Sequence, residues 1–367
     1  MCKTESDVLK QVSVRRPSDS ERAVVFRGDG EPKTPEGILN RLVEIEGDGG
    51  LEADSYSRGG TVDQLEQQFA EILGKEAAIF MPTGTLANHL AIRKHCGGKP
   101  RAVVQEQCHV YHDTGDCVTR LSGINLIPLA KDRPSFTVEE LAEVFKQSED
   151  GRVSNPIGAV MIESPVRRQM GQVVTFNEIQ AITDFCRRRA VPTHLDGARM
   201  YMMCAATGID PKAYAYCFDT VYVSLYKYFG APFGAILAGT SAFIEDLYHD
   251  RRMFGGGLAL SWMAAGLALR GAEGFAERLA AAMVQATPLF DRLNTLSGIE
   301  IGQFENGSNM FPVMLEEDVN VEAFVGALQE HEIFVSPGQE GFYLTVNTTL
   351  LRQTNDDLFD AFKASLQ

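Results

Sequence analysis

The sequence lacks an apolar run long enough to cross a membrane. The longest, "LALSWMAAGLAL", falls short of the roughly 20 residues that a spanning helix needs and is typical of a buried helix. The first residues, "MCKTESDVLKQVSVRR", contain no apolar core of the kind found in secretory signals. These absences favour a soluble protein of the cytoplasm.

Patterns for disulfides, metals and nucleotide cofactors are also missing. The seven cysteines are scattered and lack CxxC spacing, so neither a disulfide framework nor a zinc site is predicted. Lys and Arg total 34 against 49 Asp and Glu, and the net charge of −15 disfavours nucleic acids and anionic membranes as partners. No G-x-G-x-x-G follows the first strand candidate, which disfavours a dinucleotide-binding dehydrogenase. A small-molecule substrate is favoured by elimination.

What the chain does contain is a regular alternation of apolar runs and amphipathic helices. This rhythm predicts an α/β fold with a doubly wound, mostly parallel sheet, followed by a smaller C-terminal α+β domain. We expect an arm or a disordered tail over residues 1–24, a large domain over 25–245 and a small domain over 246–367. The strand candidates are "AAIF", "AVV", "NLIPL", "GAVMIE", "VPTHLD", "TVYVSL" and "FGAILAG".

Three helix starts have the pattern of a capping box, in which a Thr side chain and a Glu or Gln side chain three residues later bind free backbone amides. The predicted pairs are Thr61 with Gln64, Thr137 with Glu140, and Thr175 with Glu178. Each should mark the first turn of a helix in the large domain.

Three chemically distinctive positions follow strand candidates. Gly84 and Thr85 open a helix whose free amides favour a phosphate, unless they form a plain turn. Asp196 ends a strand, where it would either cap a helix or face a ring nitrogen. Lys227 is either a lysine that reaches solvent or one that binds an aldehyde, and Ser224 would add a hydroxyl for the phosphate. Pyridoxal 5'-phosphate requires this combination of amides, carboxylate and amine.

Two further motifs are weaker by themselves. His109, in "EQCHVYHDTGD", offers an aromatic plane for stacking on a pyridine ring and a nitrogen for moving a proton, although a surface or core histidine is an equal alternative. "DRRMFGGG" carries Arg251 and Arg252 before three glycines, and arginines on helix surfaces are usually solvated.

In this order, the segments "GKEAAIFMPTGTLANHLAI", "HLDGAR" and "SLYKYFGAPFGAILAG" resemble those of fold type I pyridoxal-phosphate enzymes of the threonine aldolase and β-eliminating lyase family. The likeness covers roughly residues 25–365. It implies that Lys227 is the Schiff-base lysine, that Asp196 partners the pyridinium nitrogen and that His109 stacks on the ring. It also implies that Gly84 and Thr85 cradle the phosphate.

The same resemblance implies roles at the substrate and at a subunit interface. Arg199 matches the arginine that pairs with the substrate carboxylate. Arg252 matches a position that reaches a phosphate in a neighbouring subunit, and Tyr56 an active-site-edge tyrosine near that interface. A homodimer or homotetramer with active sites at the interface is therefore expected.

The substrate end departs from the family pattern. Val166 stands where threonine aldolases usually carry a histidine that contacts the β-hydroxyl, and Phe342 where they carry a second carboxylate-binding arginine. Gly28 replaces a serine that helps to hold the carboxylate. These changes predict an altered substrate, because a small hydroxy amino acid would leave polar groups unsatisfied. A substitute charge would come from Arg167, Arg168 or Arg352.

The resemblance favours retro-aldol cleavage of a β-hydroxy-α-amino acid by a pyridoxal-phosphate-dependent lyase with an atypical substrate pocket. A β-eliminating lyase that breaks a C–S or C–O bond stays open. So does a specialised biosynthetic enzyme, such as a racemase, a decarboxylase or a C–C bond-forming enzyme. A catalytically silent binding protein is less favoured, because Lys227, Asp196 and Arg199 are retained together.

Overall fold

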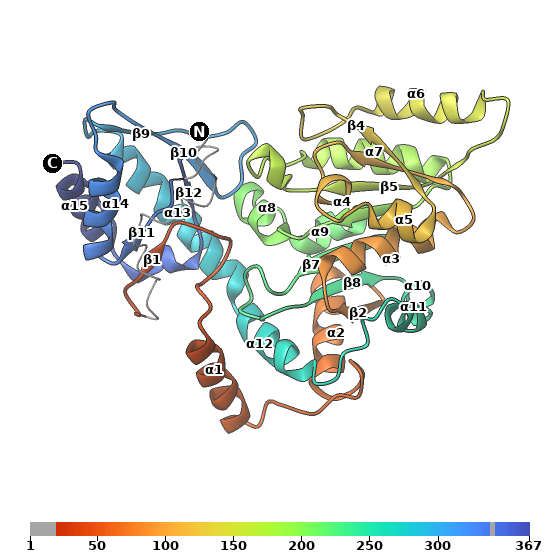
Figure 1. The fold of residues 1–367 in the computed structure, drawn as a ribbon, viewed down its shortest axis with the longest axis horizontal. Helices are drawn as coiled ribbons and strands as arrows, with labels where there is room; N and C mark the ends of the chain where they lie inside the picture. The colour runs from red at the N-terminus through yellow and green to blue at the C-terminus, as the bar shows by residue number, and fades with distance from the viewer. Residues whose placement is uncertain (1–19, 338–341) are drawn as a thin grey trace, which may run out of the picture. The chain divides into compact units, whose positions relative to one another are not determined.

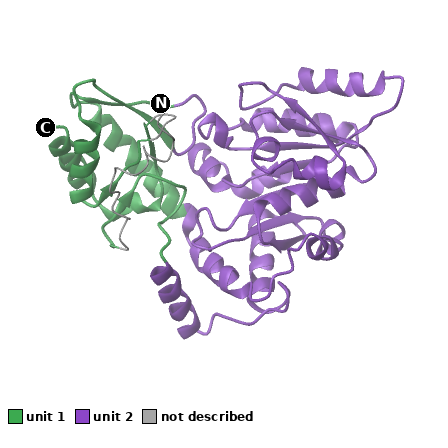
Figure 2. Cartoon of the chain, viewed as in Figure 1, with its two compact units in different colours: residues 1–34, 277–303, 310–367 green, residues 35–276, 304–309 purple. Residues whose placement is uncertain are grey.

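The computed structural model describes residues 20–337 and 342–367 (Figure 1). The chain divides into two compact units, shown in Figure 2. The large unit contains residues 35–276 and 304–309, and the small unit contains the described parts of residues 1–34, 277–303 and 310–367.

This division differs from the predicted domains at both ends of the large unit. The boundary predicted at residue 245 lies before the helix Trp262–Ala272 (α12), which packs against the helix Gly60–Leu73 (α2) within the large unit. Residues 20–34 belong to the small unit because the strand Val24–Val25 (β1) pairs there with Ile333–Phe334 (β11). Residues 1–19 of the predicted arm lie outside the described residues.

The large unit is built on a seven-stranded sheet of order β2-β8-β7-β6-β5-β3-β4. All strands run parallel except β8, which is antiparallel to both neighbours. The predicted mostly parallel sheet is therefore confirmed, and every predicted strand run is present. The strands are β2 (Ala77–Met81), β3 (Arg101–Gln105), β4 (Asn125–Leu129), β5 (Ile157–Glu163), β6 (Thr193–Asp196), β7 (Thr220–Ser224) and β8 (Ala235–Gly239).

Helices cover this sheet, and α3 crosses it in contact with β5, β6, β7 and β8 (Figure 1). The central strands β5, β6 and β7 are buried throughout because both of their faces are covered. The other helices of this unit are α1 (Pro35–Gly47), α3 (Gly84–Cys96), α4 (His109–His112), α5 (Cys117–Ser122), α6 (Val138–Glu149), η1 (Arg167–Gln169), α7 (Phe176–Arg188), α8 (Met200–Thr207), α9 (Pro211–Cys217), α10 (Ser241–Glu245) and α11 (Leu247–Met253).

Two of the three predicted capping boxes are present. Those of Thr137 and Thr175 begin α6 and α7 with both hydrogen bonds formed. The box predicted at Thr61 is wrong, because α2 begins at Gly60 and has Gly59 as its N-cap. The Thr61 hydroxyl instead accepts a hydrogen bond from the Glu52 backbone N–H at 2.7 Å, which ties the preceding loop to the helix.

The small unit is α+β, as predicted, with the antiparallel order β12-β10-β9. Its core includes Phe26, Phe324 and Phe362, whose rings pack edge to face. No helix in residues 20–337 or 342–367 is both long and apolar enough to span a bilayer. The unit contains β9 (Ile299–Ile301), β10 (Met310–Leu315), β12 (Phe342–Thr345), α14 (Val321–Glu330), η2 (Thr348–Arg352), α15 (Asn355–Ser365) and most of α13 (Phe275–Leu293).

Candidate active site

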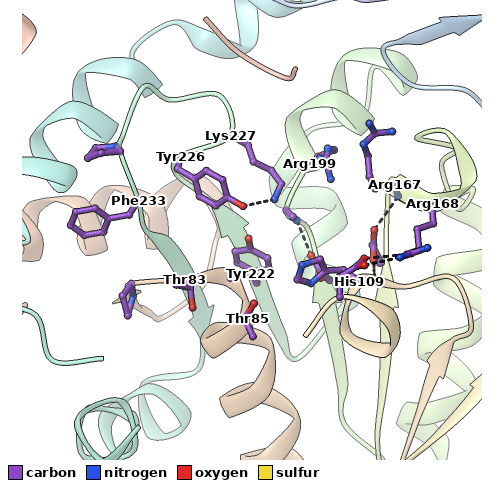
Figure 3. Close-up of a pocket in the computed structure, with 17 residues that line it drawn as sticks. Thr83, Thr85, His109, Arg167, Arg168, Arg199, Tyr222, Tyr226, Lys227 and Phe233 are labelled. Carbon is purple, nitrogen blue, oxygen red and sulfur yellow. Dashed lines mark hydrogen bonds and ion pairs between the residues drawn. The ribbon is translucent and has the colours of Figure 1, made fainter. Parts of the chain in front are cut away.

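A cavity of about 530 Å³ opens at the carboxyl edge of the large unit's sheet (Figure 3). Its lining comes from the segments that follow β2, β3, β5, β6 and β7, and from the loop that leads into the antiparallel β8. The carboxyl ends of parallel strands meet at one edge, so residues far apart in sequence converge there. Six sequence-predicted site residues line the cavity: Gly84, Thr85, His109, Asp196, Arg199 and Lys227.

The amino end of α3 forms one wall of the cavity. The Thr83 side chain accepts a hydrogen bond from the Leu86 N–H at 3.1 Å and so begins the helix. A Cβ atom on Gly84 would overlap the Tyr222 hydroxyl, so only glycine fits beside that ring. The first backbone amides of a helix, together with the helix dipole, suit a phosphate.

Asp196 lies at the end of β6 and is 1% exposed. Its Oδ2 accepts a hydrogen bond from Asn88 Nδ2 at 2.6 Å, and its Oδ1 accepts one from the Ala198 N–H at 3.1 Å. It does not cap a helix, because α8 begins at Met200 with Arg199 as its N-cap. The sequence left open whether Asp196 caps a helix or faces a ring nitrogen. This geometry fits an acceptor that faces the cavity.

Lys227 lies in the loop between β7 and β8, and its half-buried side chain lines the cavity (Figure 3). Its Nζ donates a hydrogen bond to the Tyr226 hydroxyl at 3.1 Å. The loop is anchored from behind by Tyr228 and Phe229, which are buried among aromatic rings that include Phe275. The apolar neighbours noted in the sequence therefore hold the loop in place, whereas the amine itself reaches the cavity.

Ser224, at the end of β7, is fully buried and does not line the cavity directly. Apart from a weak interaction with the Tyr222 hydroxyl, its Oγ has no hydrogen-bond partner in the described part of the chain. Burial raises the pKa of Tyr222 far above its ordinary value, so this phenol stays protonated.

Glu163 is a cavity residue that sequence reasoning missed. It ends β5 opposite Asp196 in the register and is 4% exposed. Its two carboxyl oxygens accept hydrogen bonds from the backbone N–H groups of His109, at 2.6 Å, and Arg167, at 3.0 Å. Burial and the nearby charge of Asp196 raise its pKa to about 7. The available signal was its position as the last residue of "GAVMIE", which matches the position of Asp196 in "VPTHLD".

The arginines that could replace the missing substrate contacts are found in different places. Arg167 and Arg168 line the cavity, and Arg168 makes a two-pronged contact with Asp113 at 3.1 and 2.7 Å. Val166 is fully buried beside them and does not line the cavity; its N–H donates to the Gln172 carbonyl. Arg352, in the small unit, pairs with Glu31 at 2.9 Å.

Besides Ser224 and Val166, three further predicted site residues lie outside the cavity lining. Phe342 begins β12 in the small unit, where its ring contacts Phe324. Tyr56 is 50% exposed, and the Arg252 guanidinium lies 4.5 Å from its ring centroid. Among the described residues no group of three His, Cys, Asp or Glu side chains is arranged to hold a metal ion.

The residues at the cavity fit pyridoxal phosphate, which is the cofactor of the family identified below. The amides at Gly84 and Thr85 begin a helix at the cavity, and the buried Asp196 carboxylate accepts hydrogen bonds from Asn88 and from the Ala198 N–H. The orphaned Ser224 hydroxyl is a further donor at the same sheet edge. Lys227 Nζ is an amine held inside the cavity by a single hydrogen bond to a phenol.

Comparison with known proteins gives consistent results. A low-specificity L-threonine aldolase of Candida albicans is 31% identical over 218 residues, which are 58% of this chain and 57% of that protein. Low-specificity L-threonine aldolase 1 of Arabidopsis thaliana is 24% identical over 304 residues, or 82% and 84% of the two chains. The crystal structure of a putative L-allo-threonine aldolase from Listeria monocytogenes matches with a TM-score of 0.78 at 26% identity, covering 94% of this chain and 97% of the other.

The alignment with the Candida albicans protein thus spans little more than half of that relative's length. A model of the family described as β-eliminating lyase matches residues 47–315, which include every strand of the large sheet and the whole cavity lining. The chain therefore belongs to the β-eliminating lyase family, in agreement with the resemblance of its motifs.

Proposed function

We propose that this protein is a pyridoxal-phosphate-dependent amino-acid lyase that cleaves a β-hydroxy-α-amino acid into a smaller amino acid and an aldehyde. The observation that carries the proposal is the presence of Lys227, Asp196 and Arg199 around one cavity at the sheet's carboxyl edge. An amine, a carboxylate and a guanidinium are the groups needed to hold this cofactor and an amino acid together.

When bound, pyridoxal phosphate supplies an aldehyde that condenses with amines and a ring that withdraws electrons from the bonds at Cα. Lys227 would be the amine that holds that aldehyde. Asp196 would accept a hydrogen bond from the protonated ring nitrogen, the amides at Gly84 and Thr85 would bind the phosphate, and His109 would cover the ring. Ser224 adds a hydroxyl at the phosphate end.

The chain's own groups also orient the substrate and move its protons. Arg199 would bind the α-carboxylate and so fix the orientation of the bonds at Cα. The histidine expected at position 166 is replaced by a buried Val166, so the β-hydroxyl proton passes to His109, directly or through water. The rings of Tyr226 and Phe233 at the cavity wall favour a substrate with an apolar side chain over a small hydroxy amino acid.

β-Elimination is the second candidate activity. Val166 replaces the histidine that would act on a β-hydroxyl, and it does not line the cavity. Elimination needs no such base, so this observation favours elimination. Lys227 would remove the α-proton, and a sulfur or oxygen substituent would leave from Cβ.

The described thiols are all free, which fits the proposed cytoplasmic location.

The first experiment tests the cofactor. The purified protein should absorb visible light, and borohydride should fix the chromophore covalently to the peptide that contains Lys227. The Lys227→Ala variant should lose this adduct, whereas Lys131→Ala, which removes an exposed lysine outside the cavity, should retain it. A colourless protein that borohydride does not label would refute both activities.

The second experiment separates the activities by their products. The protein is incubated with a panel of β-hydroxy-α-amino acids and of amino acids that carry a leaving group at Cβ. Aldehyde plus glycine identifies cleavage, and a 2-oxo acid plus ammonia identifies elimination. Deuterium uptake at Cα without breakdown would indicate a racemase instead, and a protein that binds pyridoxal phosphate but changes none of these compounds would be a silent binder.

A further inference from the structure

A line of buried polar side chains runs from Asp196 along the sheet to the last turn of α3. Asn88 Nδ2 lies 2.6 Å from Asp196 Oδ2, and Asn88 Oδ1 lies 2.9 Å from His194 Nε2. His194 Nδ1 lies 2.9 Å from Thr220 Oγ1, which lies 2.7 Å from His95 Nε2. All but the half-buried His95 are at most 1% exposed, so water does not compete for these contacts.

The direction of each hydrogen bond follows from the charge on Asp196. An ionised carboxylate only accepts hydrogen bonds, so Asn88 turns its NH₂ group toward Asp196 and its carbonyl oxygen toward His194. A carbonyl oxygen also only accepts, so His194 carries its proton on Nε2.

The directions of the remaining two hydrogen bonds follow from the neutral state of both histidine rings. Burial lowers the pKa of His194 to about 3 and that of His95 to about 4, so each ring has one N–H near neutral pH. With its proton on Nε2, His194 offers a lone pair on Nδ1, and the Thr220 hydroxyl donates to it. The Thr220 oxygen then accepts from the Nε2–H of His95. Every donor in the line points toward Asp196.

We propose that Asn88, His194, Thr220 and His95 are positioning residues that form a hydrogen-bond chain of fixed direction and hold Asp196 as an oriented, charged acceptor for the cofactor's ring nitrogen. This inference rests on the proposed function, because it gives Asp196 the role stated there. None of the four side chains lines the cavity, so each acts through its neighbour in the chain.

Aligned hydrogen bonds polarise one another, so a break far from Asp196 weakens the bond made by Asn88. Reversal of the chain would place the Asn88 carbonyl oxygen against the Asp196 carboxylate, and two acceptors repel. The hydrogen-bond chain therefore holds the Asp196 carboxylate in one orientation as an acceptor, which is the role that a protonated pyridine nitrogen requires.

The first test uses the full-length protein, with and without pyridoxal phosphate, labelled with ¹⁵N at histidine. We expect the ring nitrogen shifts of His194 and His95 to be those of neutral rings protonated at Nε2 in both samples, with assignment from His95→Gln and His194→Gln. A His194 ring protonated at Nδ1, or a charged ring, would overturn the proposal. This readout needs neither bound cofactor nor activity.

The second test removes the Thr220 link of the hydrogen-bond chain. Thr220→Val keeps the side-chain shape and removes the hydroxyl, and Thr220→Ser keeps the hydroxyl. We expect Thr220→Val to weaken pyridoxal phosphate binding by up to about fivefold, the effect of one neutral hydrogen bond, and to shift the His194 ring signals. Thr220→Ser should restore both. Thr183→Val is the matched control, because it removes a buried threonine hydroxyl that bonds only within α7.

The results of these tests distinguish a failure of the hydrogen-bond chain from a failure of the proposed function. Equal loss of cofactor affinity in Thr220→Val and Thr183→Val would overturn the proposal, because the effect would then be one of general stability. So would a Thr220→Val protein with unchanged affinity. A wild-type protein that binds no pyridoxal phosphate would refute the proposed function and the role of the chain at the cofactor, whereas the histidine signals would report independently on the chain itself.

Discussion

At the scale of single residues, Gly84 has no room for a side chain beside the cavity. A Cβ atom there would overlap the Tyr222 hydroxyl and ring, and Tyr222 is itself buried in the sheet. We expect Gly84→Ala to lower the free energy of unfolding by about 1–3 kcal/mol, the usual cost of overpacking, and to weaken pyridoxal phosphate binding.

Gly98 supplies the control for this substitution. A Cβ atom at Gly98 would meet nothing within 4 Å, so Gly98→Ala should change neither quantity. Denaturant unfolding and absorbance titration with pyridoxal phosphate measure the two effects. Wild-type behaviour of Gly84→Ala in both would contradict the close fit between the glycine and the tyrosine ring.

Glu66 provides a prediction about pH. Its side chain accepts a hydrogen bond from the Phe80 N–H at 2.7 Å, and burial raises its pKa from 4.5 to about 7. Between these values the folded state retains a proton that the unfolded state has released, so the contribution of Glu66 to stability is full below pH 4.5 and is lost as the pH rises through about 7.

We therefore expect the free energy of unfolding of the wild type, relative to Glu66→Gln, to fall as the pH rises from about 4.5 to 7. The slope should approach about 1.4 kcal/mol per pH unit where one whole proton is retained. Glu71→Gln, on an exposed face of the same helix, should leave the pH profile of the wild type unchanged. Urea unfolding at several pH values tests this, and parallel curves for the wild type and Glu66→Gln would contradict it.

At the scale of elements, the start of α3 combines a structural and a binding feature. Thr83 caps the helix and also lines the cavity, whereas Thr137 caps α6 away from the cavity. We expect Thr83→Ala and Thr137→Ala each to lower the free energy of unfolding by about 1 kcal/mol, the typical contribution of a cap. Only Thr83→Ala should also weaken pyridoxal phosphate binding, since it loosens the amides at the cavity.

Thermal unfolding with and without added cofactor distinguishes the two effects of Thr83→Ala. The gain in melting temperature on addition of pyridoxal phosphate should be smaller for Thr83→Ala than for the wild type and unchanged for Thr137→Ala. An equal gain in all three proteins would show that the first turn of α3 does not contact the cofactor.

At the scale of the whole molecule, the helix α1 carries exposed apolar side chains. Leu39 and Val43 are 62% and 71% exposed, and they border a groove of about 490 Å³ with Leu51 and Trp262. Exposed apolar area of this kind marks interaction surfaces. It supports the proposed homodimer or homotetramer, in which a second copy of the chain would cover this groove.

We expect Val43→Glu to shift the oligomer toward monomer, because the interface would bury an unpaired carboxylate. Val153 is 70% exposed but lies away from the groove, so Val153→Glu should keep the oligomer of the wild type. Light scattering after size exclusion measures the mass of each protein. A monomeric wild type, or a Val43→Glu protein with the same mass as the wild type, would contradict the use of this surface.

Much of the large unit was predictable because its signals are local. Most strands are short apolar runs, and two of the three threonine caps can be recognised within four residues of sequence. The third failed because Gly59 and Gly60 adopt positive φ angles, which start α2 before Thr61. The antiparallel direction of β8 also had no local signal, because the same apolar run pairs equally well in either direction.

The sequence by itself determined the alternation of strands and helices, and with it the placement of Gly84, Asp196 and Lys227 at strand ends. Parallel strands share a carboxyl edge, so these residues had to approach one another. Only the tertiary structure decided which side chains touch. It put Glu163 under His109, kept Val166 out of the cavity and connected Asp196 to His95, because contacts between distant segments depend on register and packing, which local periodicity does not encode.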